Sequence, residues 1–260
     1  MSINKIAALI LLCLGAQARA GDLVRARYVM GTVCEITARG PRAEAGIAAA
    51  FSEIERWDRI LSLYKKESEA SRMNREAGRG PFLASESLWE AVTKALSAAQ
   101  RSQGAFDPTL RPQGFSQVRL DKARRSVFFQ TPDLKMDFGG IGKGLALDHA
   151  AAALRAHGVT RALINFGGQI IALGPWTVQS PAGPLDVENA SVSTSGDGEQ
   201  PGHIINPATG LAVHNPDAVV VAPTAAEADA WSTALYVTNG KIPPAFKDCT
   251  SCRYHKGEQQ

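Results

Sequence analysis

A glycine-rich segment, residues 137–144, carries the residue types that bind a phosphate group. It reads Asp-Phe-Gly-Gly-Ile-Gly-Lys-Gly and lies between an expected strand and an expected helix, where free N–H groups and the helix dipole attract anions. A Walker A loop is excluded because Asp137 stands at its first glycine position and Gly144 follows Lys143; the spacing also differs from the dinucleotide fingerprint G-x-G-x-x-G. A plain strand-to-helix turn would explain the glycines but not the lysine between two of them. We therefore expect a phosphate site.

Asp229 and Thr233 form a second candidate group. They are four residues apart in an expected helix, so both side-chain oxygens project from one face. A carboxylate and a hydroxyl suit Mg²⁺, a hard cation that takes few protein ligands and completes its octahedron with phosphate oxygens and water. Taken alone, the pair is better explained as an Asp stabilised by the helix dipole with a Thr nearby by chance. A magnesium site requires this helix to face the glycine bend that holds Lys143.

His203 is the third candidate. Of the five histidines in the chain, it is the one embedded in turn residues and small hydroxyl residues, with Thr194–Asp197 before it and residues 204–210 after it. A histidine in such a loop can act as a general base toward a hydroxyl nucleophile. A lone loop histidine is more often structural or solvated, so His203 alone does not decide the function.

The elements that must position these groups are a mixture of helices and strands. Because they do not alternate strictly, we expect an α+β fold with mixed, largely antiparallel sheets and packed helices rather than a doubly wound fold. Periodicity and capping signals predict helices at 44–63, at 87–104 after a capping box at Ser87–Glu90, at 145–157, and at 225–237 after a capping box at Thr224–Glu227. The same signals predict a strand pair within 23–38 and strands at 126–130, 134–138, 161–166, 170–173, 176–179 and 219–222.

The two ends of the chain differ from its middle. Residues 1–20 have a positive start at Lys5, an apolar run at Ile6–Leu14 too short to span a bilayer, and a small-x-small triplet at Ala18–Ala20. This pattern predicts a secretory signal peptide. We expect residues 21–240 to form one domain and residues 241–260 to form a short C-terminal tail.

The charge balance excludes some partners. The chain has 28 Lys and Arg against 25 Asp and Glu, and removal of the expected signal takes away Lys5 and Arg19 and no acid. The remaining chain is nearly neutral. It gives no electrostatic reason to expect nucleic acid or an anionic membrane surface as a partner.

The tail contains a Cys-x-x-Cys motif, Cys249 and Cys252. A zinc site would need four ligands, and the tail offers only these two and His255. A redox motif would normally lie at a strand-to-helix junction, whereas this pair follows Pro243 and Pro244 in a polar tail. We expect a local disulfide, or no function.

Taken in order, these pieces resemble one family, the FAD:protein FMN transferases, also called the ApbE family or thiamine-biosynthesis lipoproteins. Each motif is weak alone, but seven or more in the family's order, spread over residues 28–238, make the match specific. The matching motifs are Met30–Thr32, Ser62–Tyr64, Phe106–Thr109, Asp137–Asp148, Asn165–Gly168, Thr194–Gly196, His203–Gly210 and Ala228–Ala234.

The resemblance implies roles for individual residues. Asp229 and Thr233 match the family's Mg²⁺ ligands, and the backbone carbonyl near Ala146 matches a third. His149 and His203 match positions that face the nucleotide. The other positions that match FAD contacts are Met30, Tyr64, Ala105, Phe106, Asp107 and Lys143.

The implied reaction is a phosphoryl-type transfer. Mg²⁺, bound by Asp229, and Lys143 would neutralise charge on the FAD pyrophosphate so that AMP can leave. A Thr or Ser hydroxyl of an acceptor protein would attack the FMN phosphorus, with His203 as the candidate base. Acceptors in this family are FMN-binding domains of exported or membrane electron-transfer systems. That agrees with the signal peptide and implies a periplasmic protein, free or attached to the inner membrane.

The chain departs from the family's pattern at three positions and at its end. Asn206 stands where Asp is usual, Ala208 where Arg is common, and Gln169 replaces an acidic or amide residue. The tail also ends where relatives continue with further strand. Two alternatives stay open: an FAD pyrophosphatase that uses water, against which Tyr64 argues, and a non-catalytic flavin-binding protein, for which Asn206 and the short tail argue.

Overall fold

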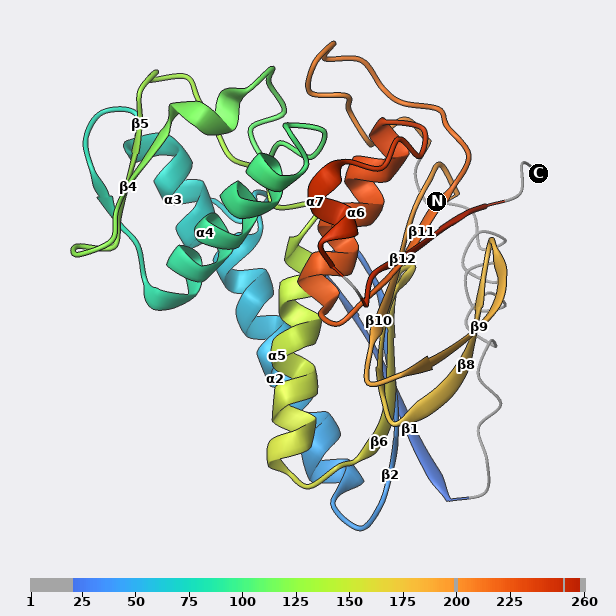
Figure 1. The fold of residues 1–260 in the computed structure, drawn as a ribbon. Coiled ribbons are helices and arrows are strands. Elements are labelled where there is room, and N and C mark those ends of the chain that lie inside the picture. Colours follow the sequence, from blue (N-terminus) through green and yellow to red (C-terminus); the bar gives the residue numbers. More distant parts are fainter. Residues whose placement is uncertain (1–20, 199–200, 250, 258–260) are drawn as a thin grey trace, which may run out of the picture.

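The computed structural model describes residues 21–198, 201–249 and 251–257, and Figure 1 shows their arrangement. The expected signal segment, residues 1–20, lies outside the described residues. Among the described residues, no helix combines the length and the apolar character needed to cross a membrane. The expected α+β class is confirmed, because helices pack against sheets whose strands pair antiparallel.

The largest sheet has seven strands in the order β1-β2-β6-β7-β10-β11-β12. The expected strand pair within 23–38 is the β1–β2 hairpin, with Met30 and Gly31 in its turn. The five residues of β11 are all buried, as is typical of a strand that is covered on both faces. The strands are β1 (Asp22–Val29), β2 (Thr32–Arg39), β6 (Arg161–Phe166), β7 (Gln169–Leu173), β10 (Ser191–Ser195), β11 (Ala218–Ala222) and β12 (Arg253–Lys256).

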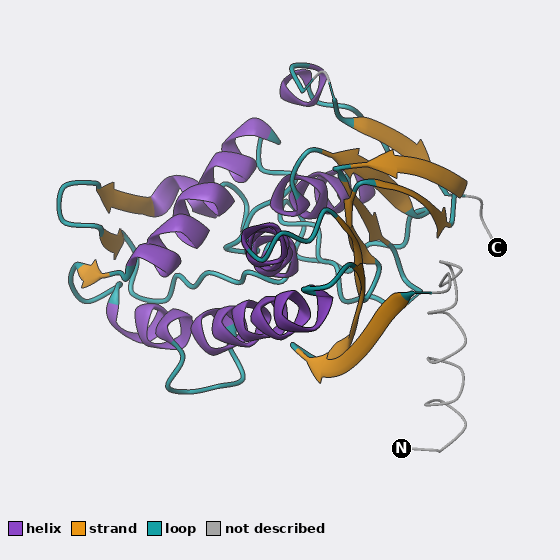
Figure 2. Cartoon of the chain, turned by 90° about the horizontal axis from the view of Figure 1, so that it is seen from below, coloured by secondary structure: helices purple, strands orange, loops and turns teal. Residues whose placement is uncertain are grey.

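Helices cover one face of this sheet and a hairpin covers the other (Figures 1 and 2). The helical layer holds α2 (Ala43–Leu61), α5 (Gly142–Ala156) and α6 (Ala225–Val237). On the opposite face, the hairpin of β8 (Pro175–Ser180) and β9 (Gly183–Glu188) contributes to a separate apolar cluster with the sheet. Both helices that carry the candidate site residues, α5 and α6, therefore lie in one layer.

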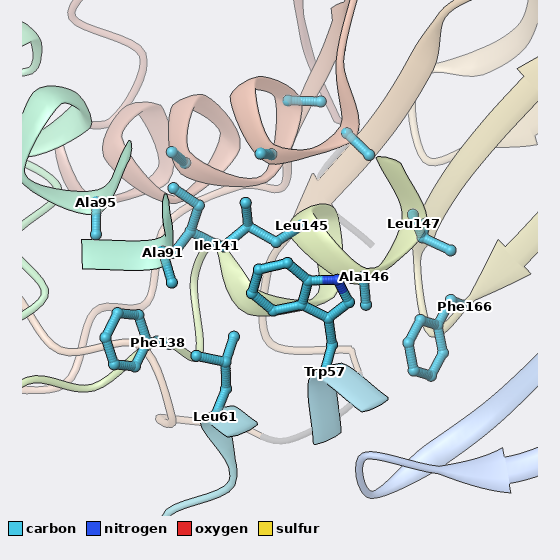
Figure 3. Packing of buried hydrophobic residues seen from close by; sticks show 14 of the residues in the cluster. Trp57, Leu61, Ala91, Ala95, Phe138, Ile141, Leu145, Ala146, Leu147 and Phe166 are labelled. Carbon is cyan, nitrogen blue, oxygen red and sulfur yellow. The ribbon is translucent and has the colours of Figure 1, made fainter. Parts of the chain in front are cut away.

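The core is closely packed between α2 and α5, and Figure 3 shows this region from close by. Trp57 of α2 is fully buried, and its ring lies beside Leu61, Leu145 and Ala146. Burial of each large apolar side chain contributes roughly 1.5–3 kcal/mol. This packing holds the first turns of α5, into which the glycine-rich segment leads.

α5 and α6 meet at a glycine. A Cβ atom on Gly144 would lie 2.3 Å from the carbonyl oxygen of Ala225, closer than any side chain allows. Only glycine therefore lets the first turn of α5 reach the first turn of α6. The α6 boundaries match the prediction: the hydroxyl of Thr224 accepts a hydrogen bond from the N–H of Glu227.

α5 is also tied to α4 (Glu86–Arg101) by a polar contact. A ring nitrogen of His149 lies 3.0 Å from a carboxylate oxygen of Glu90, and Lys94 lies 2.9 Å from the other oxygen. The His149 ring also packs on Trp57, with 4.9 Å between ring centroids. The hydrogen bond with His149 has the largest effect on the pKa of Glu90, and the hydrogen bond with Lys94 lowers it further. Together they bring this pKa down to about 2, although partial burial acts in the opposite direction.

A smaller region lies beyond α2 and α5, on the side away from the large sheet (Figure 1). Its antiparallel sheet has the order β3-β5-β4. Its elements are α3 (Glu69–Glu76), β3 (Phe82–Leu83), α4, a 3₁₀ turn (Gly114–Gln117), β4 (Val118–Asp121) and β5 (Ser126–Phe129).

Two local predictions in this region were wrong. The N-cap of α4 is Ser85, whose hydroxyl accepts from the N–H of Leu88, whereas Ser87 lies inside the helix. Residues 134–138 do not form a strand. The side-chain amide of Asn74 hydrogen-bonds both the N–H and the C=O of Met136, so it replaces the partner strand.

The segment after residue 240 enters the main sheet. It forms the short helix α7 (Pro244–Lys247) and then β12, which pairs antiparallel with β11. The sheet therefore extends beyond the domain boundary expected at residue 240, and the tail does contribute a strand. The expected disulfide between Cys249 and Cys252 is confirmed.

We expect Gly144→Ala to destabilise the protein. The added methyl group would collide with the Ala225 carbonyl and force α5 and α6 apart, which costs about 1–3 kcal/mol and lowers Tm by about 3–10 °C. Thermal unfolding measures the effect. Gly80→Ala is the matched control, because a Cβ there would have no neighbour within 4 Å. Equal Tm values for the two variants would contradict the close approach.

We expect Glu90→Gln to lower stability at pH 7 but not at pH 2. The pKa of Glu90 lies below its usual 4.5 in the folded state, so its contribution is complete above pH 4.5 and is lost as pH falls toward about 2. Urea unfolding at several pH values should show the two proteins converging across this range. The control is Glu188→Gln, at an exposed position in β9. A pH-independent difference would refute the pairing as its cause.

Candidate active site

The glycine-rich segment forms a tight bend at the start of α5. The carboxylate of Asp137 accepts a hydrogen bond from the N–H of Gly139 at 2.6 Å, and the carbonyl of Phe138 accepts from the N–H groups of Ile141 and Gly142. Lys143 follows in the first turn of the helix. The bend thus places a lysine at the positive end of the α5 helix dipole, which favours a bound anion.

Asp229 of α6 faces this bend directly. One oxygen of its carboxylate accepts a hydrogen bond from the N–H of Gly144 at 3.0 Å, and the side chain is buried. Burial raises the pKa of Asp229, whereas the nearby charge of Lys143 and the Gly144 hydrogen bond act in the opposite direction. The two elements that a diphosphate site requires therefore lie side by side.

Thr233 lies one turn further along α6 and also meets the bend. A Cβ on Gly140 would stand 2.9 Å from the hydroxyl oxygen of Thr233 and 3.1 Å from the ring of Phe106. The hydroxyl of Ser195, at the end of β10, lies 3.5 Å from that of Thr233 and 2.8 Å from that of Ser232. Oxygen atoms from α6 and β10 therefore collect next to the glycine bend.

Sequence reasoning assigned no role to Asp148, which holds these helices together. Its carboxylate accepts hydrogen bonds from the N–H groups of Ala225 at 2.7 Å and Ala226 at 3.1 Å, the first residues of α6. Burial raises its pKa, and the two backbone hydrogen bonds oppose that rise. The available signal was its spacing: Asp148 follows Gly144 by four residues, so both lie on the α5 face that meets α6.

Gln169, one of the departures from the family's pattern, lies at the same junction. Its amide nitrogen donates to the carbonyl of Ala225 at 3.0 Å and to the hydroxyl of Ser191 at 3.2 Å. The side chain is buried, and its carbonyl oxygen has no hydrogen-bond partner among the described residues. The Gln169 side chain therefore links β7 to β10 and to the start of α6.

One of the expected flavin contacts, Met30, lies close to the bend. The end of the Met30 side chain lies 4.0 Å from the position of a Cβ on Gly142, and Leu61 lies 3.2 Å from the same point. Met30 occupies the left-handed region in the β1–β2 turn, with φ of 47°. Tyr64, just beyond the end of α2, has a fully exposed side chain.

Phe106 and Asp107, in the segment Ala105–Asp107, have different roles. The ring of Phe106 is buried against Gly140, whereas Ala105 is only partly buried. Asp107 is buried, and its carboxylate accepts hydrogen bonds from both the N–H and the hydroxyl of Thr109 and from the N–H of Phe115. Asp107 thus shapes its own loop, and its contact with FAD stays a prediction.

His203 is exposed and lies at the base of a hairpin-like loop. The loop is closed by a β-bridge between Ile205 and Ala212. Within its tip, the side-chain oxygen of Asn206 accepts from the N–H of Ala208, a turn contact that an Asp would make equally well. The substitution at Asn206 therefore preserves the shape of the loop and removes only its charge.

A His–Asp pair that sequence reasoning missed fixes the base of this loop. The carboxylate of Asp197 lies 2.6 Å from a ring nitrogen of His214 and accepts from the N–H of Gly202, next to His203. The hydroxyl of Tyr236 on α6 donates to the carbonyl of Val213. Since Asp197 and His214 are 17 residues apart, sequence spacing gave no signal for the pair.

The two remaining expected site residues lie deeper along α5. Ala146 is fully buried, with its side chain in the packed cluster around Trp57 (Figure 3). His149 engages Glu90 and Trp57 at the α4–α5 contact. A carbonyl ligand at Ala146 and a nucleotide contact at His149 stay predictions.

This arrangement has the chemistry of a site for a hard divalent cation and a phosphate. The Asp229 carboxylate is buried with one backbone donor and a lysine nearby, and a hydroxyl lies one turn away. A buried carboxylate costs several kcal/mol unless a positive charge compensates for it. A bound cation would supply that charge, and the N-terminus of α5 with Lys143 would hold an anion beside it.

The comparisons with known proteins agree with this geometry. A model of the ApbE family matches residues 30–114 and 110–247. The FAD:protein FMN transferase of Treponema pallidum is 29% identical and aligns with 86% of this chain and 80% of its own length. The proteins of the same name from Klebsiella pneumoniae and Escherichia coli K12 are 30% and 33% identical, with 80% and 69% of this chain and 76% and 67% of theirs aligned.

Solved structures share the fold. The ApbE protein of Thermotoga maritima superposes with a TM-score of 0.80 at 22% identity, over 90% of this chain and 94% of that one. The flavinyl transferase ApbE of Pseudomonas stutzeri gives a TM-score of 0.77 at 21% identity, over 93% and 98%. With its glycine bend, its α6 oxygens and the match of the family model along most of its length, this chain belongs to the ApbE family.

Proposed function

We propose that this protein transfers FMN from FAD to a Thr or Ser hydroxyl of an acceptor protein and releases AMP, with Mg²⁺ as the required metal. Curated relatives of the chain bear the name FAD:protein FMN transferase, which supports the flavin substrate and the protein acceptor. The observation that carries the proposal is the contact between Asp229 of α6 and the N–H of Gly144, beside Lys143. It brings a cation-binding carboxylate to an anion-binding helix terminus.

Asp229 and Thr233 would hold the metal, with the carbonyl of Ala146 as a third ligand. When bound, Mg²⁺ would neutralise negative charge on the diphosphate. Lys143 and the positive end of the α5 dipole would attract the diphosphate oxygens and keep them in position. Because Asp229 is buried, its charge acts in a medium of low dielectric constant, where it attracts a cation more strongly than it would in water.

In the transfer step, the acceptor hydroxyl oxygen forms a bond to the FMN phosphorus. The bond between that phosphorus and the bridging oxygen breaks, and AMP leaves with the electron pair. His203 would take the proton of the hydroxyl. The exposure of His203 supports this role, because the attacking group must arrive from another protein. The loop base fixed by Asp197 and His214 would hold His203 in place.

The flavin would bind at the rim of the bend. Tyr64 offers a fully exposed ring on which the isoalloxazine can stack, and Met30 and Phe106 offer apolar contacts beside the bend. Ala105, Asp107 and His149 complete the residues that match the family's FAD contacts. Stacking on an exposed aromatic ring leaves one face of the flavin open to an acceptor.

The proposed setting is the periplasm. Residues 1–20 have the charge, apolar run and cleavage-like triplet of a signal peptide, so we propose an exported protein, free or attached to the inner membrane. The acceptor would be an FMN-binding domain of an exported or membrane electron-transfer system. The nearly balanced charge of the chain supports no role for nucleic acid.

The proposal is tested by mixing the protein with FAD, Mg²⁺ and an FMN-binding acceptor domain. We expect the acceptor to gain the mass of FMN and AMP to appear in equal amount, and we expect EDTA to stop both. Mass spectrometry and chromatography measure the two products. AMP without a mass increment would indicate an FAD pyrophosphatase instead, and neither product would indicate a flavin-binding protein. Either result refutes transfer.

We expect Asp229→Asn to lower AMP release by at least ~100-fold, because a metal ligand worth several kcal/mol is lost. In EDTA, the Tm of this variant should equal or exceed that of the unchanged protein, since the amide removes a buried charge and still accepts from Gly144. The control is Asp186→Asn on the β8–β9 hairpin, on the opposite face of the sheet. Undiminished AMP release by Asp229→Asn at saturating Mg²⁺ would remove the metal assignment.

A further inference from the structure

We propose that Cys249, Cys252 and Glu227 form a redox-gated site for a thiophilic divalent cation such as Zn²⁺. The site would be closed while the two cysteines form a disulfide, and it would open when that disulfide is reduced. The proposal does not depend on the transfer of FMN, because none of the three residues belongs to the glycine bend or to the α6 face that meets it.

The three side chains already form a ligand cluster. One sulfur from each cysteine and one carboxylate oxygen of Glu227 all lie within 4.8 Å of one another, and all three residues are partly buried. Thiolates paired by a C-x-x-C spacing, with a carboxylate, are ligands that zinc accepts, and a water molecule can take a fourth position.

The third ligand comes from α6 and not from the tail. The sequence places Asp248 and His255 close to the two cysteines, but among the described residues the structure groups neither of them with the two sulfur atoms. Glu227, more than twenty residues earlier, lies in the first turn of α6. The fold thus completes a set of ligands that sequence spacing does not reveal.

Contacts other than the disulfide hold the tail in this position. Phe246 of α7 packs edge-on against Trp231 of α6, with 5.2 Å between ring centroids, and Figure 1 shows α7 beside α6. On the other side of the cysteines, β12 pairs with β11 over four residues. Reduction of the disulfide therefore leaves both sulfur atoms next to Glu227, so little ordering entropy opposes metal binding.

The charge around the cluster also favours a bound cation. Two thiolates and a carboxylate carry three negative charges, so a divalent cation would leave one. Arg101 lies 2.8 Å from one oxygen of Glu227 and compensates for that charge. The other oxygen of Glu227 would then bind the metal. The guanidinium group is itself held over the ring of Trp231, at 5.2 Å.

The site opens by reduction of the disulfide and then binds the metal. A dithiol reductant gives two electrons and two protons to the disulfide, so that the S–S bond breaks and two thiols form, while the reductant becomes a disulfide. Zn²⁺ then binds the two sulfur atoms, and the two thiol protons pass to solvent. Cys34 does not compete for the metal, because its thiol is fully buried within the core.

Zinc binding to the full chain tests the site. The oxidised and the chemically reduced proteins are titrated with Zn²⁺ against a chromogenic chelator, in millimolar Mg²⁺ to occupy oxygen sites, and the bound metal is counted by native mass spectrometry. We expect one additional Zn²⁺ in the reduced protein, with an affinity at least ~100-fold above that of the oxidised protein. Equal zinc binding by the two forms would overturn the proposal.

Variants separate the three ligands. In the reduced state, we expect Glu227→Gln to weaken zinc binding by about tenfold or more, and Cys249→Ser with Cys252→Ser to abolish it. Glu86→Gln, in the first turn of α4, is the matched control and should bind as the unchanged protein does. Unchanged affinity in Glu227→Gln would overturn the three-ligand site.

A second substitution distinguishes the loss of a metal ligand in Glu227→Gln from a loss of folding. Glu227→His removes the carboxylate and its pair with Arg101 but supplies another zinc ligand. Retained binding in Glu227→His together with loss in Glu227→Gln supports a ligand at this position. Equal loss in both variants, with thermal unfolding unchanged, would contradict a ligand role for residue 227.

Discussion

The site depends on two carboxylates, one on α5 and one on α6, each of which accepts hydrogen bonds from the first turn of the other helix. Asp148 of α5 accepts the first two N–H groups of α6, and Asp229 of α6 accepts the N–H of Gly144 in the first turn of α5. These backbone donors have no partner within their own helix, so each carboxylate satisfies the start of the other helix. The lack of a side chain at Gly144 allows the helices to approach closely enough for both contacts.

These reciprocal contacts have an electrostatic consequence. Burial raises the pKa of both carboxylates, because one or two backbone hydrogen bonds compensate only in part for the loss of water. Lys143 is the cation whose charge acts on Asp229 in the structure. Lys94 and His149 act on Asp148 in the same sense, but burial remains the largest cause for both carboxylates, and the proposed cation would lessen its cost. The cost of that burial is the physical reason to regard the junction as a site and not as plain packing.

The departures from the family's pattern leave the frame around the site intact. Asn206 makes a turn contact with Ala208, and the side-chain amide of Gln169 donates to the carbonyl of Ala225 at the start of α6. The short tail adds a strand to the sheet, because β12 pairs directly with β11. The same tail lies against α6 through Phe246, so the helix that carries Asp229 is supported on its outer side as well.

The sequence by itself determined the class of the fold, the limits of α6 and the candidate groups, because periodicity, capping residues and glycine spacing act over a few neighbouring residues. It wrongly predicted a strand at residues 134–138, where the side chain of Asn74 takes the place of a partner strand, and it did not predict the roles of Asp148 or of the Asp197–His214 pair. Only the tertiary structure decided that Asp229 meets Gly144, 85 residues earlier, and that Glu227 meets the tail cysteines. The reason is that such contacts depend on how whole helices cross, and no local pattern in the chain encodes the distance between two residues so far apart.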